Sequence, residues 1–219
     1  MDLGKLRYLD PYYYFDAFWE RYVGEGGPTK TVGDILYTII LAVFLYYLLG
    51  VLLHTPGPIV IVASTSMVPT LHRGDIAVVM GIPPASVEAP EVYLDVNENF
   101  HVLPSDINIH FIREGIELRE INVAGKVIPL ERNGTIIVYH DDLQNRDIIH
   151  RAILKIKTPR GYLFLTKGDN DETNPTADQD CIGGMCVYPF LISQNQVLGT
   201  PVLVIPRVGL IKLIFFPSG

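Results

Sequence analysis

The stretch Ser64-Thr65-Ser66-Met67-Val68-Pro69-Thr70-Leu71 lies between two runs of mostly β-branched and apolar residues, Ile59–Ala63 and Ile76–Met80. Such runs favour β-strands, so the hydroxyl-rich stretch is predicted to form a turn between two buried strands. It also follows soon after a long apolar run that ends at Leu53. Most serine-rich turns only hydrogen-bond their own loop. A nucleophile here would therefore need a base and a carboxylate from elsewhere in the chain.

The apolar run from Ile35 to Leu53 contains no charged residue. As a helix it would span about 28 Å, close to the thickness of a bilayer core, and we predict a transmembrane anchor over residues 35–54. A buried helix of a soluble protein is the alternative. Basic residues precede the run, whereas none occurs between its end and Arg73, which favours a cytoplasmic N-terminus and an extracytoplasmic remainder. The preceding basic residues are Lys5, Arg7, Arg21 and Lys30.

Residues 1–34 are predicted to form a cytoplasmic segment that contains an interfacial helix. Asp10-Pro11 is typical of a helix start, with proline at the first helical position. The segment that follows is strongly aromatic, with Tyr12, Tyr13, Tyr14, Phe15, Phe18, Trp19 and Tyr22. Such rings favour the headgroup level of a membrane, although a helix that packs on a partner protein could have the same composition.

Residues 55–205 are predicted to form one mainly antiparallel β domain, with an accessory insertion over residues 81–133 and an apolar tail over 206–219 at the membrane interface. Asn133-Gly134 is typical of a tight hairpin turn, and with Thr135 it also matches a glycosylation acceptor pattern. The predicted strands are Ile59–Ala63, Ile76–Met80, Ile107–Ile112, Ile116–Val123, Val127–Leu130, Thr135–His140, Ile148–Lys157, Gly161–Thr166 and Gln196–Ile205.

Composition limits the classes of function. The chain has 219 residues, 48% of them hydrophobic, a net charge of −7 and no basic stripe, so a nucleic-acid partner is not expected. The mean hydropathy of +0.26 fits a chain with a membrane segment. Cys181 and Cys186 could form a small disulfide or remain free thiols, while a zinc site is disfavoured because no second cysteine pair is present.

Two further segments carry residues that could work with a serine. His150, one of six histidines, lies inside an apolar strand-like run, where a buried structural role is the more common one. The segment from Thr166 to Asp180 is rich in carboxylates, but it lacks the glycine and glutamate positions of a calcium-binding EF-hand loop. A solvated turn is one interpretation of this segment, and a carboxylate that orients a histidine is the other.

Five short segments resemble the motifs of type I signal peptidases and follow one another in the family's order. Ser64–Leu71 resembles the family's S-x-S-M-x-P-T-L box, and Ile149-His150-Arg151 resembles its I-H-R box. Thr166-Lys167-Gly168-Asp169, followed by Asn174-Pro175 and Asp178, resembles its T-K-G-D…N-P-x-x-D box. The strand boxes of the family match Gly74–Val79 and Gly134–Tyr139. Histidine, rather than lysine, at position 150 resembles the archaeal and endoplasmic-reticulum branch, and we expect an archaeal enzyme.

The resemblance implies a role for individual residues. Ser66 would be the nucleophile, His150 the general base and Asp178 the residue that orients the imidazole, with Asp169 supporting the same loop through Arg151. The Ser66 backbone N–H and the Ser64 hydroxyl would form the oxyanion hole. The other residues implied in substrate binding are Met67 and Pro69.

Two departures from the family pattern leave questions open. Thr65 stands where glycine is often found, and a threonine would be strained there if the position required a positive φ. The acidic loop is also longer than the pattern, so Asp171 or Asp180 could replace Asp178 as the orienting acid.

The implied function is removal of signal peptides from secretory preproteins after small residues, without a metal or organic cofactor. The implied location is the cell membrane, as a single-pass protein in contact with the lipid bilayer, with the translocon as a further implied partner. Three alternatives are a LexA-like self-cleaving regulator, a non-catalytic membrane-anchored β scaffold and a calcium-binding surface module. The first lacks support because the chain has no DNA-binding region and no lysine in the base position.

Overall fold

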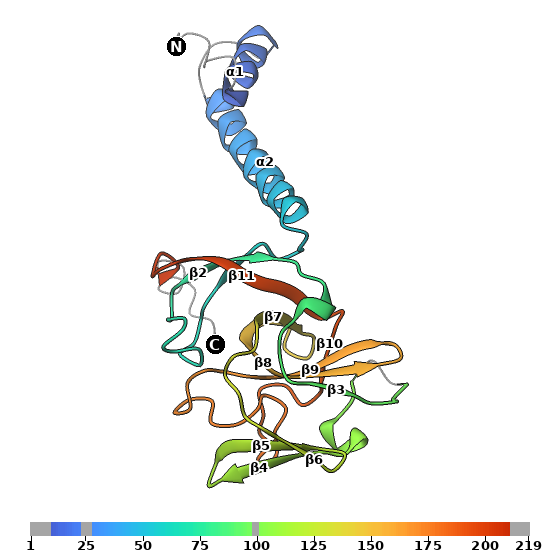
Figure 1. Ribbon diagram of the computed structural model, residues 1–219. Helices are drawn as coiled ribbons and strands as arrows, with labels where there is room; N and C mark the ends of the chain where they lie inside the picture. The colour runs from blue at the N-terminus through green and yellow to red at the C-terminus, as the bar shows by residue number, and fades with distance from the viewer. Residues whose placement is uncertain (1–9, 23–27, 98–100, 211–219) are drawn as a thin grey trace, which may run out of the picture. The chain divides into compact units, whose positions relative to one another are not determined.

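The computed structural model describes residues 10–22, 28–97 and 101–210, which form two compact units (Figure 1). The first unit covers residues 1–49 and the second covers residues 50–219. The predicted tail over residues 206–219 therefore lies largely outside the described residues, as do residues 1–9 of the predicted N-terminal segment.

The first unit contains two helices, α1 (Pro11–Tyr22) and most of α2 (Pro28–Leu52). The predicted start of α1 is confirmed, because the Asp10 carboxylate accepts a hydrogen bond from the Tyr12 N–H at 2.9 Å. Aromatic side chains of α1 pack on the beginning of α2: Phe15 stacks on Tyr37 with ring centroids 4.4 Å apart. The ring of Trp19 covers Gly33, where a Cβ atom would come within 2.5 Å of it.

Helix α2 begins at Pro28, earlier than the predicted span, and Lys30 in its first turn forms an ion pair with Asp16 of α1 at 2.7 Å. Its most apolar window has a mean hydropathy of 2.5. Among the described residues it is the one helix that is long and apolar enough to cross a bilayer.

The second unit is mainly antiparallel β, as predicted. Its large sheet has the strand order β1-β2-β11-β7-β8-β9-β10, and β3 adds to β8 in parallel. A separate sheet has the order β4-β5-β6 and lies at the end of this unit remote from β2 and β11 (Figure 1). The large sheet consists of β1 (Ile59–Ile61), β2 (Ile76–Met80), β3 (Glu91–Tyr93), β7 (Ile136–Asp141), β8 (Arg146–Thr158), β9 (Gly161–Lys167), β10 (Ile192–Ser193) and β11 (Val197–Ile205). The small sheet consists of β4 (Ile109–Glu114), β5 (Glu117–Val123) and β6 (Lys126–Pro129), and short 3-10 turns span Pro84–Ser86 and Pro104–Ile107.

The core lies on both sides of the long central strand β8. Every residue from Ile148 to Ile156 except Arg151 is buried, although neighbouring residues of a strand point to opposite faces. Ile153 and Leu154 belong to one apolar cluster. Ile121 of β5 belongs to the same apolar cluster as these two residues, so the small sheet packs against the large one. A second cluster surrounds Met67 and includes Ala77 of β2. The serine stretch is therefore attached to the core rather than to a free loop.

Every predicted strand is present, Ile76–Met80 with the same bounds and the others with shifted ends, but the hairpin predicted at Asn133-Gly134 is wrong. Strand β6 pairs with β5 in the small sheet, whereas β7 pairs with β8 and β11 in the large one. The segment thus passes from one sheet to the other. Glycine is needed at position 134 because the backbone there lies close to β8. A Cβ atom at this position would lie 1.9 Å from the Ala152 carbonyl oxygen. The short strands β3 and β10 were not predicted.

Candidate active site

The serine stretch forms a compact turn between β1 and β2 that is anchored by Met67. The Met67 side chain is fully buried, and its carbonyl oxygen accepts a hydrogen bond from the Leu71 N–H at 2.9 Å. Thr65 does not have a positive φ, so threonine is not strained where the family often has glycine. Pro69 is exposed and follows a cis peptide bond. Because the side chain of Met67 lies in the core, any contact between this residue and a substrate would involve its backbone.

His150 lies near the middle of β8 and is only 4% exposed. Its Nε2 atom is 2.8 Å from Ser66 Oγ, and its Nδ1 atom is 2.7 Å from Asp178 Oδ2. An ionised carboxylate can only accept hydrogen bonds, so Nδ1–H donates to Asp178 and Nε2 is left to accept the Ser66 proton. The structure thus brings Ser66, His150 and Asp178 into one continuous chain of hydrogen bonds.

Asp178 is fully buried and is held by donors other than His150. Thr166 Oγ1 donates to its Oδ2 atom at 2.6 Å, and the Tyr139 hydroxyl donates to the same atom at 3.0 Å. Asn174 Nδ2 donates to Oδ1 at 3.3 Å. Burial raises the pKa of Asp178, but the charge and hydrogen bond of His150 and the two hydroxyl donors outweigh burial, and the pKa lies below its ordinary value. Asp178 is therefore a carboxylate at neutral pH.

Asp169 joins the same loop to the serine stretch. Its two oxygens accept hydrogen bonds from Arg151 Nε at 2.8 Å and Nη2 at 2.7 Å, which confirms the predicted contact. The Thr70 hydroxyl also donates to Asp169. Burial raises the pKa of Asp169, but Arg151 and Thr70 outweigh it and the net direction is downward. This carboxylate connects β8, the serine stretch and the acidic loop without touching His150.

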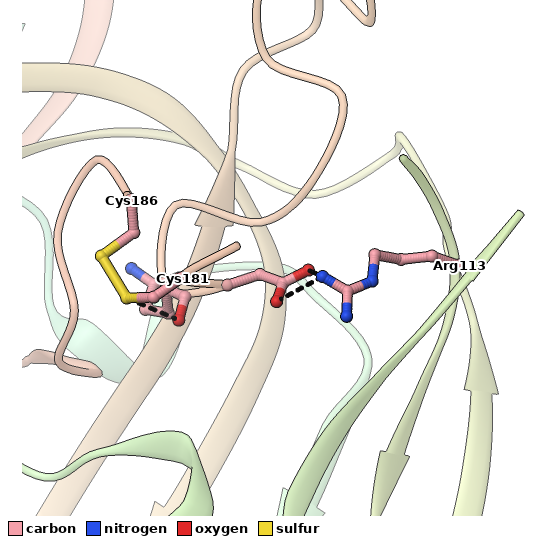
Figure 2. Close-up of a disulfide and its surroundings, with 5 residues drawn as sticks. Arg113, Cys181 and Cys186 are labelled. Carbon is pink, nitrogen blue, oxygen red and sulfur yellow. Dashed lines mark hydrogen bonds and ion pairs between the residues drawn. A yellow bond between two sulfur atoms is a disulfide. The ribbon is translucent and has the colours of Figure 1, made fainter. Parts of the chain in front are cut away.

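Asp171 and Asp180, the two alternative orienting acids, pair with cations away from His150. Arg113 of β4 donates to both oxygens of Asp180, at 2.9 and 2.8 Å, beside the disulfide between Cys181 and Cys186 (Figure 2). Asp171 accepts hydrogen bonds from Lys167 and Arg132. Of the three loop acids that the sequence left open, Asp178 is the one that contacts the histidine.

The carboxylates of the acidic loop do not converge. Among residues 10–22, 28–97 and 101–210, the structure contains no group of three or more metal-ligating side chains that could hold an ion. Asp169, Asp171, Asp178 and Asp180 are instead directed at Arg151, at Lys167 and Arg132, at His150 and at Arg113, respectively. A calcium site in this loop therefore has no support from the arrangement of the side chains.

Ser64 lies next to the candidate nucleophile. Its Oγ atom is 2.9 Å from Ser66 Oγ and 3.5 Å from the Ser66 nitrogen. A hydroxyl and a backbone N–H thus lie within a few ångströms of the Ser66 oxygen, where the predicted oxyanion hole would be. Their role in binding an oxyanion stays a prediction.

The sequence did not single out every residue of this arrangement. Thr166 and Asn174 belong to a recognised motif, but nothing in the motif says that they hold Asp178. No sequence pattern indicated a role for Tyr139, because its approach to Asp178 depends on the pairing of β7 with β8. Asn170 contacts the serine turn across a separation of 105 residues in the chain, which no local pattern predicts.

The lowered pKa values of Asp169 and Asp178 predict a loss of stability in acid. A carboxylate whose pKa is lower in the folded state stabilises the fold fully at pH values above its unfolded-state pKa, which is about 3.9 for aspartate. This stabilisation is lost as the pH falls through the folded-state pKa. We expect the urea midpoint of the detergent-solubilised protein to fall between about pH 5 and about pH 2. Asp169→Asn should lower the midpoint at neutral pH and reduce the acid-induced drop. Equal midpoints for the parent protein at both pH values would contradict this.

The hydroxyl–imidazole–carboxylate chain from Ser66 through His150 to Asp178 is the arrangement of serine hydrolases. No family model matches the chain. It is similar to the signal peptidase complex catalytic subunit SEC11 of Tuber melanosporum, at 25% identity over 85% of this chain and 80% of the relative. The subunits of the same name from Eremothecium gossypii and Pyricularia oryzae are 24% and 26% identical, over 85% and 86% of this chain and 81% and 83% of those relatives. The homologues of the chain are thus catalytic subunits of signal peptidase, in agreement with its motifs.

Proposed function

We propose that this chain is a membrane-anchored serine endopeptidase that removes signal peptides from secretory precursors. The observation that carries the proposal is the Ser66–His150–Asp178 hydrogen-bond chain, which is built from the same boxes that resemble type I signal peptidases. A non-catalytic β scaffold would need the strands but would have no use for a serine aligned with a buried histidine and carboxylate.

The geometry supports a two-step acyl transfer. Ser66 Oγ attacks the carbonyl carbon of the scissile peptide bond while His150 Nε2 takes its proton. The same imidazole then gives the proton to the leaving amine, and the signal peptide remains as an ester on Ser66. A water molecule, deprotonated by His150, hydrolyses the ester. Asp178 keeps Nδ1–H as a donor throughout and stabilises the imidazolium that forms in each step.

Substrate binding by strand addition fits the sheet. Strand β1 is the terminal strand of the large sheet, and β2 occupies one of its edges. An extended segment of the precursor would pair with the other edge of Ile59–Ala63 and so lead its scissile bond toward Ser66. Small residues at the first and third positions before the bond would be selected by shallow apolar pockets beside this edge.

Lipid contact is supported by a second feature of the same strands. Ile59, Val78 and Leu203 are direct cross-strand neighbours on β1, β2 and β11, and so share one face of the sheet. Ile61, Ile76 and Ile205 form a second such row. Leu203 is 56% exposed and Ile59 is 43% exposed. An apolar face of this kind marks an interaction surface, and we assign it to the outer leaflet.

The topology follows from the anchor. Residues 53–58 alone separate α2 from β1 along the chain. Basic residues before the span favour a cytoplasmic N-terminus, and the Cys181–Cys186 disulfide favours an oxidising, extracytoplasmic location for the domain. We place α1 at the cytoplasmic interface, with Tyr14, Phe18 and Tyr22 as its exposed aromatic face. The cell membrane of an archaeon and contact with the translocon belong to the same proposal.

The substrate class can be tested with matched precursors. A precursor with alanine at the first and third positions before the cleavage site should be cut by the detergent-solubilised protein at one bond, identified by mass spectrometry. Changing the first of these alanines to tryptophan should abolish the cut, because a shallow pocket excludes a large ring. Equal cleavage of both precursors would contradict the proposed specificity, and cleavage of neither would contradict the proposed function.

A further inference from the structure

Asn170, a residue of the acidic loop, binds the backbone of the serine turn at two successive carbonyl groups. Its side-chain Nδ2 donates to the Thr65 carbonyl oxygen at 3.0 Å, and its backbone N–H donates to the Ser66 carbonyl oxygen at 2.8 Å. These two oxygens belong to the peptide groups on either side of Ser66. Asn170 therefore fixes the orientation of both peptide planes that flank the candidate nucleophile.

The first of these planes contains the N–H group that the mechanism needs. In a trans peptide the C=O and N–H bonds point in opposite directions, so a donor that binds the Thr65 carbonyl directs the Ser66 N–H to the other side of the plane. That side carries the Ser64 hydroxyl, 3.5 Å from the Ser66 nitrogen. The hydrogen bond at the carbonyl also polarises the peptide group and makes its N–H a stronger donor.

Asn170 is itself held in place by its loop. Its Oδ1 atom accepts a hydrogen bond from the Glu172 N–H at 3.1 Å. This contact leaves the Nδ2 end of the amide facing Thr65. Its carbonyl oxygen accepts from the Asn174 N–H at 2.8 Å. The approach of this loop to the turn also requires Gly168, because a Cβ atom there would lie 2.5 Å from the Ser66 carbonyl oxygen. The contact is thus part of a hydrogen-bonded junction between two distant segments.

We propose that Asn170 is a positioning residue that aims the Ser66 backbone N–H at the developing oxyanion. This inference rests on the proposed serine-protease function and adds to it a residue that does not touch the substrate. The side-chain amide acts through the Thr65–Ser66 peptide group, so its loss should weaken binding of the transition state and leave binding of the ground state unchanged.

Asn170→Asp is the sharpest variant, because it keeps the shape of the side chain and the acceptor for Glu172 while replacing the donor with a carboxylate oxygen. We expect kcat for a signal-peptide precursor to fall about tenfold or more with KM unchanged, since removing an oxyanion donor outright typically costs a hundredfold or more. Asn170→Ala should show a smaller loss of the same kind, because it removes the donor without adding repulsion. Asn145→Asp makes the same chemical change at an exposed turn between β7 and β8 and should retain the parent kcat.

A second readout does not depend on the precursor. A fluorophosphonate reacts when Ser66 Oγ forms a bond to phosphorus and fluoride leaves, with His150 accepting the serine proton and negative charge developing on the phosphoryl oxygen. The rate of labelling should fall in Asn170→Asp by a factor similar to that of kcat. If the parent protein is labelled but cuts no precursor, the proposed function fails while the role of Asn170 is still measured by the labelling rates.

The outcome that overturns the inference is a parent-like kcat and labelling rate in both Asn170 variants. A rise in KM with kcat unchanged would also overturn it, because that result would place Asn170 in substrate binding. Thermal unfolding of each variant shows the folded fraction. A loss of activity that disappears after correction for this fraction would assign Asn170 a structural role only and so contradict the proposal.

Discussion

Replacing Asp178 by asparagine is expected to lower kcat about ten-thousandfold, the typical cost of this change in a serine–histidine–aspartate triad. The physical reason is the tautomer of His150. Asp178 Oδ2 accepts the Nδ1 hydrogen at 2.7 Å and so leaves Nε2 free to accept the Ser66 proton. An amide at this position can present its NH2 group to Nδ1, which then becomes the acceptor and places the ring hydrogen on Nε2. Ser66 would lose its base although all three side chains remained in place.

Asp180→Asn is the matched control for this prediction. Asp180 lies in the same loop and is also buried, but its oxygens bind Arg113 and Thr176 rather than the histidine. The change should reduce stability through the weakened contact with β4 and leave kcat near that of the parent. Initial rates on an alanine-site precursor, with urea unfolding of the same samples, separate the two effects. A large loss of kcat in Asp180→Asn together with an active Asp178→Asn protein would reverse the assignment of the acid.

The second large effect is expected from His150→Ala, which should lower kcat to a level similar to that of Ser66→Ala. Each change removes either the donor or the acceptor of the proton transfer from Ser66 to His150, so this transfer can no longer occur. In triads of this type the loss is about a millionfold for either residue, and removing both costs about as much as removing one. The double variant Ser66→Ala, His150→Ala should therefore be no slower than either single variant.

Much of this site could be predicted because its chemistry is concentrated in short motifs. Ser66, His150 and Asp178 were each identified from a box of a few residues, and the strands around them from their β-branched runs. The motif favoured Asp178 over Asp171 and Asp180, but the lengthened loop kept the sequence alone from deciding among the three acids. The choice depends on which carboxylate the turns of the lengthened loop direct at β8, and on where Arg113, Lys167 and Arg132 lie to pair with the others.

Features that arise from contacts between distant segments could not be predicted from local sequence patterns. Asn133-Gly134 has the composition of a hairpin turn, but the strands on either side bury their apolar faces in different sheets, and the packing of Gly134 against Ala152 decides its conformation. Tyr139 and Asn170 meet the site only after β7, β8 and the acidic loop have come together. The sequence thus predicts which groups react, while the fold determines which groups hold them.

The measurement that tests the central claim most directly is cleavage of an alanine-site precursor by four purified proteins side by side: the parent chain, Ser66→Ala, His150→Ala and the double variant. Thermal unfolding confirms that each is folded. We predict a cut at one bond by the parent chain and no detectable cut by the other three. Equal cleavage by all four proteins would show that Ser66 and His150 do not carry the reaction and would contradict the account.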